Sequence, residues 1–466
     1  MTLVHRSAAL GLLASLWGCA AAGPSASPDA QPDAAPPSDT GGPAQPDAAG
    51  HTDTADTADT GGTGGTTGTT DAAPPDSAMQ PDATALPETG APDRPPAPDA
   101  PPQVVGTCAA LGPVGTWQEI TPPAVKTGLA SRMPSDAGGT FSFAVDPVNS
   151  GTVYAGTVYQ KMWKSTDCGA TWTQLGTGRN AGAWDHAMNW TFAVDPQQPN
   201  VVYTNSGYGT MGNGLLKSTN GGVDWDIVWP PALQPDLGKH FMYNFANVVT
   251  IDPADHLHLI LTFHESCIGM PGVSTCIAES SDAGATWKLL PGDPSWNGNE
   301  GQLFYFLENA RTWIWASQTN GFFRTDTAGA TWAALKDDKG KGFFPSHLQG
   351  AGLYRAKNGF FYVAAGDGIF RSPDGKTWTL AANTGPIGGG IASDGTTIFA
   401  SRCFFGGFCA AGTQVFLSTP ETDGVNWTIL PDGPRIAMGG EMHYDSGHHL
   451  MYASTFGQGF WRMVTK

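Results

Sequence analysis

The fold is decided by one stretch, Ser165-Thr-Asp-Cys-Gly-Ala-Thr-Trp172. Asp and Gly favour a tight turn, because an Asp side chain accepts hydrogen bonds from nearby backbone N–H groups and Gly tolerates a positive φ. Ser165 is expected to end the strand that enters this turn, and Trp172 to begin the strand that leaves it. Related stretches, some shortened or extended, lie at 218–225, 280–287, 325–332, 372–378 and 418–427. A motif that occurs six times along one chain indicates a repeat architecture.

The segments between the turns repeat as well. Ahead of the first turn lie three short stretches typical of strands, 141–147, 152–156 and 161–164. With the stretch that follows the turn, they give four short strands per repeat. The six turn tryptophans are 45 to 62 residues apart, which is the size of one blade of a β-propeller. The sequence therefore predicts an all-β propeller made of four-stranded blades.

The two ends of the repeat region supply a seventh blade between them. After the last turn we expect three more strands, at 442–445, 450–453 and 459–464, without a fourth. A matching strand lies at 115–120, where the repeat region begins. We therefore predict that Thr116–Ile120 pairs with Gly459–Val464 as the outer strand of the seventh blade. This pairing closes the ring and covers a sheet edge that would otherwise be unpaired.

The first 19 residues are typical of an export signal. A short basic start at His5 and Arg6 precedes an apolar run from 8 to 17, which is too short to span a bilayer as a helix. Cys19 follows in a context that resembles a bacterial lipobox. We expect acylation of Cys19 and attachment to the bacterial cell envelope, at the outer membrane or the cell surface; the alternative is ordinary cleavage and free secretion.

Residues 20–105 form a linker of low complexity that separates the signal from the propeller at 106–466. The linker carries 13 acidic residues and one arginine, and so accounts for −12 of the net charge of −18. Its composition, rich in Pro, Asp, Thr and Gly, predicts disorder. The acidity therefore belongs mainly to a tether. No basic run or aromatic-basic stripe indicates a nucleic-acid partner, and we expect a monomer that meets the membrane only through its lipid.

The chain has seven cysteines, of which six remain if Cys19 is lipidated. An even number in an oxidising compartment favours disulfides. Each of two pairs brackets one short loop, Cys267 with Cys276 and Cys403 with Cys409. Cys108 and Cys168 are left to pair across neighbouring blades. The sequence contains no Cys-x-x-Cys pair, so it indicates no metal site, and it indicates no cofactor.

Candidate site residues lie in the long loops on the face opposite the repeated turns, just before the innermost strands. The catalytic candidates are Asp185, His186, His240, Glu300 and Glu441. The binding candidates are Trp184, Tyr243, His347, His443, Arg132, Arg179 and Arg435. Because inner strands surround the axis, we expect one depression to be shared by His186, His240, Glu300, His347, Glu441 and His443, with the tryptophan and tyrosine as stacking faces for a sugar. The three arginines lie in loops of adjacent blades, and we expect them to converge on the carboxylate of an acidic sugar. The alternatives are that the polar groups satisfy loop backbone and that the arginines are separate surface residues.

The S-x-D-x-G-x-T-W pattern resembles the Asp-box (BNR) repeat, and residues 115–466 resemble Asp-box propellers. These include sialidases, xyloglucanase-type glycoside hydrolases and the sortilin luminal domain. Arg132 lies in a stretch similar to the sialidase Arg-Ile-Pro element, but it lacks the preceding aromatic residue, so the sialidase arginine triad is not transferred. We expect a propeller that recognises a glycan or polysaccharide; if it is an enzyme, we expect a glycosidase or a polysaccharide lyase. Because the family also includes binders, the alternative is a non-catalytic propeller that binds protein in envelope assembly or adhesion.

Overall fold

The computed structural model describes residues 101–127, 139–207, 214–232, 234, 237, 246–264, 277–292, 296, 301–307, 309, 311–345, 352–385, 389–402, 415–430, 433–434 and 440–466. The predicted signal, Cys19 and the linker up to residue 100 lie outside these residues. So do the cysteines of the two predicted loop disulfides, Cys267, Cys276, Cys403 and Cys409. No helix among the described residues has the length and apolar character needed to cross a membrane.

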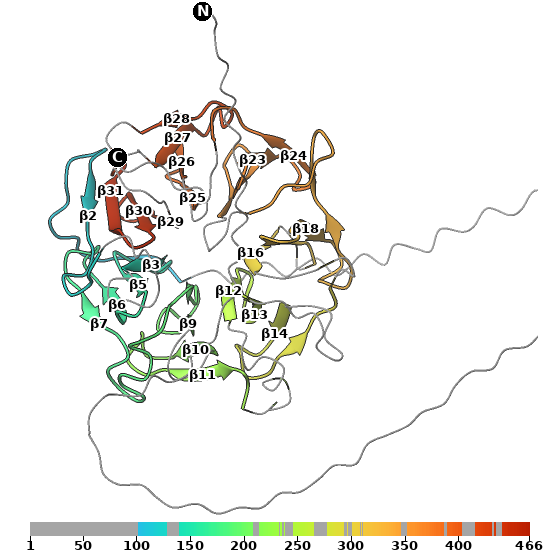
Figure 1. The fold of residues 1–466 in the computed structure, drawn as a ribbon. Coiled ribbons are helices and arrows are strands. Elements are labelled where there is room, and N and C mark those ends of the chain that lie inside the picture. Colours follow the sequence, from blue (N-terminus) through green and yellow to red (C-terminus); the bar gives the residue numbers. More distant parts are fainter. Residues whose placement is uncertain are drawn as a thin grey trace, which may run out of the picture. The chain divides into compact units, whose positions relative to one another are not determined.

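The described strands form seven antiparallel blades that follow one another in chain order (Figure 1). Blade 1 contains β3 (Thr140–Val145), β5 (Val153–Thr157), β6 (Met162–Ser165) and β7 (Thr173–Gln174). Blade 2 contains β8 (Phe192–Val194), β9 (Val202–Ser206), β10 (Gly214–Ser218) and β11 (Asp226–Trp229). Blade 3 contains β12 (Ala246–Asp252), β13 (Asp255–Phe263), β14 (Ile277–Ser280) and β15 (Lys288–Leu289). Blade 4 contains β16 (Gly301–Phe306), β17 (Trp313–Ser317), β18 (Gly321–Thr325) and β19 (Ala333–Ala334).

The remaining three blades complete the ring. Blade 5 contains β21 (Leu353–Arg355), β22 (Phe361–Ala365), β23 (Gly368–Ser372) and β24 (Thr377–Leu380). Blade 6 contains β25 (Ile391–Ser393), β26 (Thr397–Ser401), β27 (Phe416–Pro420) and β28 (Thr428–Ile429). Blade 7 contains β29 (Met442–Asp445), β30 (Leu450–Thr455), β31 (Gly459–Val464) and β2 (Trp117–Glu119). The first-named strand of each blade is the innermost, and β29 of blade 7 packs beside β3 of blade 1.

Blade 5 departs from the predicted four strands, because β20 (Lys336–Asp337) adds a fifth, parallel to β24. The pairing with β24 and a hydrogen bond from the N–H of Asp338 to the carbonyl of Trp378 hold the segment that leaves blade 4 against the outer edge of blade 5. A local turn lies beside this pairing, where Asp337 Oδ1 accepts hydrogen bonds from the backbone N–H groups of Lys339 and Lys341. A strand of two residues is too short to show a periodic sequence pattern, so the sequence does not predict β20.

The repeated turns are built as their residues predict. In the first, Ser165 Oγ accepts from the N–H of Gly169 at 2.8 Å and donates to Asp167 Oδ1 at 2.7 Å. The same carboxylate accepts from both the N–H and the hydroxyl of Thr171, at 2.8 and 2.6 Å. Gly169 has a φ of 89°, which an L-residue with a side chain rarely adopts. The bond set recurs in full around Asp282. Its serine bonds and the bond from the threonine N–H recur around Asp374.

The turn tryptophans pack between blades. Trp225 has no exposed surface and lies in a core cluster with Tyr154 and Met162 of blade 1 and Leu216 of blade 2. Trp172 instead donates from its indole N–H to the carbonyl of Ile120 in the preceding blade, at 2.7 Å. Each turn therefore joins its own blade to the previous one, and the apolar surface buried at these seams is the main source of stability in such a fold.

The predicted ring closure is confirmed. β2 pairs antiparallel with β31, with Trp117 opposite Met463 and Glu119 opposite Trp461. Backbone hydrogen bonds from Gly115 to Val464 and from Ile120 to Phe460 extend the pairing at both ends. Strands from the two ends of the repeat region thus lie side by side in Figure 1.

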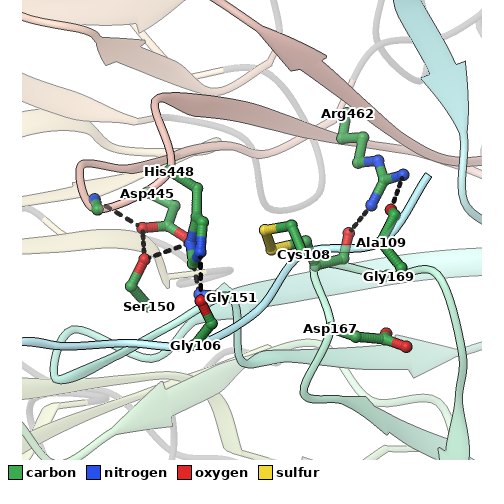
Figure 2. Close-up of a disulfide and its surroundings, with 12 residues drawn as sticks. Gly106, Cys108, Ala109, Ser150, Gly151, Asp167, Gly169, Asp445, His448 and Arg462 are labelled. Atoms are coloured by element: carbon green, nitrogen blue, oxygen red, sulfur yellow. Dashed lines mark hydrogen bonds and ion pairs between the residues drawn. A yellow bond between two sulfur atoms is a disulfide. The ribbon is translucent and has the colours of Figure 1, made fainter. Parts of the chain in front are cut away.

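A second N-terminal element reinforces this closure. β1 (Val104–Val105) pairs parallel with β4 (Asn149–Ser150) of the turn that follows β3. The predicted disulfide between Cys108 and Cys168 is confirmed (Figure 2), with Cα atoms 5.2 Å apart, inside the usual range. We call residues 101–113 the strap, because they cross the junction of blades 7 and 1 and are bonded to both.

Candidate functional site

The best-described part of the candidate site lies where β29 begins, beside blade 1. Side chains alternate along a strand, so Glu441, His443 and Asp445 share one face. Met442 and Tyr444, on the other face, pack with the apolar cluster between blades 6 and 7. The sequence pattern thus turns three titratable groups towards the seam with blade 1.

The Glu441 carboxylate is held in place by backbone groups. Its Oε2 accepts from the N–H of Phe143 in β3 at 2.8 Å, and its own N–H donates to Ser454 Oγ at 3.0 Å. His443 Nε2 lies 3.5 Å from the same Oε2. The Glu441 side chain is 22% exposed and the His443 side chain is 35% exposed. A fixed, partly exposed carboxylate beside an imidazole can accept hydrogen bonds from hydroxyl groups and can exchange a proton with its neighbour.

A second pair of predicted residues lies in the loop that enters blade 2. Asp185 Oδ2 forms an ion pair with Lys161 Nζ at 3.5 Å, and the Asp185 carbonyl accepts from the N–H of Lys161 at 3.2 Å. Lys161 belongs to the connection between β5 and β6, so this loop rests on blade 1. His186 is exposed on the same loop. Asp185 is therefore a positioned anion, and His186 is available to solvent.

Two of the predicted binding residues have other roles. Trp184 is only 6% exposed and packs with Tyr154, Phe192 and Trp225 in the core between blades 1 and 2. The expectation that Trp184 presents a stacking face is therefore wrong, because its ring fills a seam between blades. Arg179 forms an ion pair with Asp226 of the outer strand β11.

The position of Arg179 corrects the expected arginine cluster. Its backbone N–H also donates to Asp224 in the turn of blade 2, so Arg179 lies by the repeated turn and the outer strand. Arg132 and Arg435 lie outside the described residues. Arg179, which is the described member of the three, therefore gives no support to a convergence of three guanidinium groups on one acid.

The remaining candidates also lie outside the described residues: His240, Tyr243, Glu300, His347. The shared depression that they would form with Glu441, His443 and His186 stays a prediction. The described residues bring together Glu441 with His443, and Asp185 with Lys161.

A set of buried polar links that the sequence did not predict joins the first or second strand of one blade to the next blade. Donors on one blade bond backbone carbonyls on the next: Ser142 to Asn189, Asn205 to Ala246, Asn247 to Gly301 and Ser401 to Gly440, at 2.6 to 2.7 Å. These side chains are fully buried, or nearly so. They satisfy backbone groups that the diverging strands of neighbouring blades leave unpaired. Their signal in the sequence is a small polar residue near the start of a first strand, as in Ser142 and Asn247, or near the end of a second strand, as in Asn205 and Ser401.

No protein-family model matches the chain. The chain is 27% identical over 296 residues to a xyloglucanase of Hypocrea jecorina (strain QM6a), a match that covers 55% of this chain and 34% of that relative. Among solved structures, the GH74 enzyme of Niastella koreensis matches with a TM-score of 0.51 at 16% identity, over 74% of this chain and 53% of that one. The structure of YCF48 bound to D1 peptide matches with a TM-score of 0.51 at 12% identity, over 78% of this chain and all of that one. These structural likenesses show the propeller fold alone.

Proposed function

We propose that this propeller recognises a polysaccharide of the xyloglucan type, at the loop face where the inner strands begin. The observation that carries the proposal is the similarity to a xyloglucanase over 296 residues. Because the chain spans 34% of the length of that relative, the activity of the whole relative is not assumed for it.

The described side chains fit such a ligand. Sugar hydroxyl groups donate hydrogen bonds to fixed carboxylates, and Glu441 and Asp185 are both held by backbone or ionic contacts. Hydrolysis would need two carboxyl groups about 5–10 Å apart across the scissile bond. A Glu441–His443 pair 3.5 Å apart also offers a route for proton exchange.

The proposal extends to the identity of the repeat, the membrane anchor and the assembly state. The repeated turns are Asp boxes, Cys19 is acylated after export, and the chain works as a monomer at the envelope. The bonding of Asp167 and Ser165 to the turn backbone supports the first point. The pairs Cys267–Cys276 and Cys403–Cys409 then brace the long loops on the glycan face.

The test is a binding panel with the full chain. Affinity electrophoresis in gels that contain xyloglucan, mixed-linkage glucan, xylan, mannan or polygalacturonate shows which polymer retards the protein, and release of reducing ends shows cleavage. We expect retardation by xyloglucan, weakened in Glu441→Gln. The matched control is Glu119→Gln, on the outer strand β2. A loss of turnover in Glu441→Gln that exceeds its loss of binding identifies an enzyme. Normal mobility in every polymer refutes the proposal and favours the protein-binding alternative.

A further inference from the structure

An exposed aromatic side chain lies between blades 4 and 5, across the ring from the described part of the candidate site (Figure 1). Phe344 is 45% exposed, and every other aromatic side chain in the described ranges is at least partly buried. It belongs to the segment that leads from β20 to β21. One exposed apolar side chain is ordinary on a protein surface, so its meaning depends on how the ring is held and on what surrounds it.

The backbone that carries Phe344 is fixed by the buried residue before it. The ring of Phe343 stacks on Phe322 of β18 and on Phe370 of β23, with ring centroids 4.6 and 4.4 Å apart. Phe343 therefore fills the seam between blades 4 and 5. The carbonyl of Phe344 itself accepts from the N–H of Gly366 at 2.8 Å. The exposed ring thus extends from a fixed base, and a ligand that packs on it has little chain to order.

The contacts of Phe344 place it on the loop face. The first strand of each blade begins at this face, so the second strand ends there, and the turn between the second and third strands lies on it. Gly366 belongs to that turn in blade 5, between β22 and β23. In the same turn of blade 4, a Cβ atom placed on Gly321 would lie 3.3 Å from Phe344 Cε1, and the φ of Gly321 is 89°. Glycine at 321 therefore leaves room for one edge of the ring, and Phe344 lies between the turns of two blades.

The groups next to this ring are polar or have no side chain. Gly321 and Gly366 contribute backbone alone. Lys341 Nζ lies 2.9 Å from Asp367 Oδ2, and these side chains are 68% and 55% exposed. The hydrogen bond to Asp367 raises the pKa of Lys341, so the lysine stays charged and the pair has no net charge. The surroundings of Phe344 therefore offer hydrogen-bond donors and acceptors without an excess of either charge.

These surroundings fit a sugar better than a protein partner. A protein interface surrounds an aromatic anchor with further apolar side chains in a desolvated core. A pyranose instead places a small face of C–H groups on an aromatic ring, and its hydroxyl groups lie around that face and bond polar neighbours. An uncharged setting also gives no advantage to a uronate, whose carboxylate would need a free cation.

We propose that Phe344 is the stacking face of a second glycan subsite, which binds a neutral pyranose unit of the polysaccharide recognised by the loop face. This inference rests on the proposed function. One C–H face of the sugar packs on the ring, and Lys341 and Asp367 exchange hydrogen bonds with its hydroxyl groups. Because the subsite lies across the ring from Glu441, it serves a polymer and not a single sugar. It supplies the aromatic face that Trp184, buried in its seam, does not provide.

The experiment is affinity electrophoresis of the full chain at increasing concentrations of xyloglucan, which gives a dissociation constant for each variant. Phe344→Ala should weaken binding by about tenfold. Phe344→Leu keeps apolar surface but has no flat face, so it should bind like the alanine variant, whereas Phe344→Trp should bind at least as tightly as the wild type. Because the ring is exposed, these variants should keep Tm within about 2 °C of the wild type.

The matched control is Leu380→Ala, because Leu380 is 41% exposed on β24 of blade 5 and should bind xyloglucan normally. Wild-type affinity in Phe344→Ala or in Phe344→Leu overturns the subsite and leaves the proposed function standing. Weakening by Phe344→Ala without weakening by Glu441→Gln supports the subsite and contradicts a site at Glu441. Equal retardation by polygalacturonate and xyloglucan contradicts the neutral sugar. A wild-type chain that no polymer retards refutes the proposed function, and the subsite with it.

Discussion

Replacement of Trp117 by alanine tests the ring closure quantitatively. Trp117 lies on the closing strand β2, is 8% exposed and stacks on Phe416 of blade 6 with ring centroids 4.6 Å apart. It also packs against Met463 in the same core cluster. Truncation of a buried tryptophan to alanine costs about 3–5 kcal/mol, from lost transfer free energy and the cavity left behind.

The assay is thermal and denaturant-induced unfolding of the full chain. At the roughly 2–4 °C per kcal/mol that applies to large domains, Trp117→Ala should lower Tm by about 6–20 °C. Val114→Ala is the matched control, because Val114 is 61% exposed just ahead of the same strand and should change stability by less than about 0.5 kcal/mol. A loss below about 1 kcal/mol in Trp117→Ala would show that β2 does not close the ring.

Three further outcomes follow from the described contacts. Burial by itself raises the pKa of Asp167, but hydrogen bonds from Thr171 and Ser165 outweigh it, so the pKa is lowered, as it is for Asp282. A carboxyl group with a lowered pKa stabilises the folded state at pH values above its unfolded pKa of about 3.9. That stability is lost as pH falls through the folded pKa. The loss of stability with falling pH, followed by circular dichroism, should therefore be less steep in Asp167→Asn. The double variant Cys108→Ser/Cys168→Ser removes a disulfide between residues 60 positions apart and should cost about 4 kcal/mol of stability by the chain-entropy estimate. A variant with the same Tm as the disulfide-bonded wild-type chain would contradict this prediction. Asn205→Ala removes the side chain that accepts from the Trp190 N–H and donates to the Ala246 carbonyl and should cost about 2–4 kcal/mol, measured by urea unfolding.

The elements that could be predicted from the sequence depend on local chemistry. The turn at Ser165–Trp172 needs only its own Asp, Gly, Ser and Thr, and those residues make its bonds. The closing strand followed from a count of strands, since three at one end of the repeat region require a fourth. The pairing of Cys108 with Cys168 is what the two loop pairs leave, and the closure places these two cysteines in neighbouring blades.

The elements that escaped prediction depend on distant partners. β20 and the strap are held by contacts with segments far away in the chain. Trp184 and His186 are two residues apart, yet one fills a core and the other is exposed, because the loop is shaped by blade 1 and has no strand periodicity. Asn205 and Asn247 give no local sign of a partner, yet each bonds a carbonyl on the next blade.

The most direct measurement of the central claim is hydrogen–deuterium exchange of the full chain with and without soluble xyloglucan. Binding at the loop face should slow amide exchange in 183–188 and 440–444, the segments that hold Asp185, His186, Glu441 and His443. The repeated turns at 165–172 and 280–287, at the opposite ends of the blades, should exchange as in the free protein. Slowing confined to those turns, or no change at saturating polysaccharide, would contradict a glycan site at the start of the inner strands.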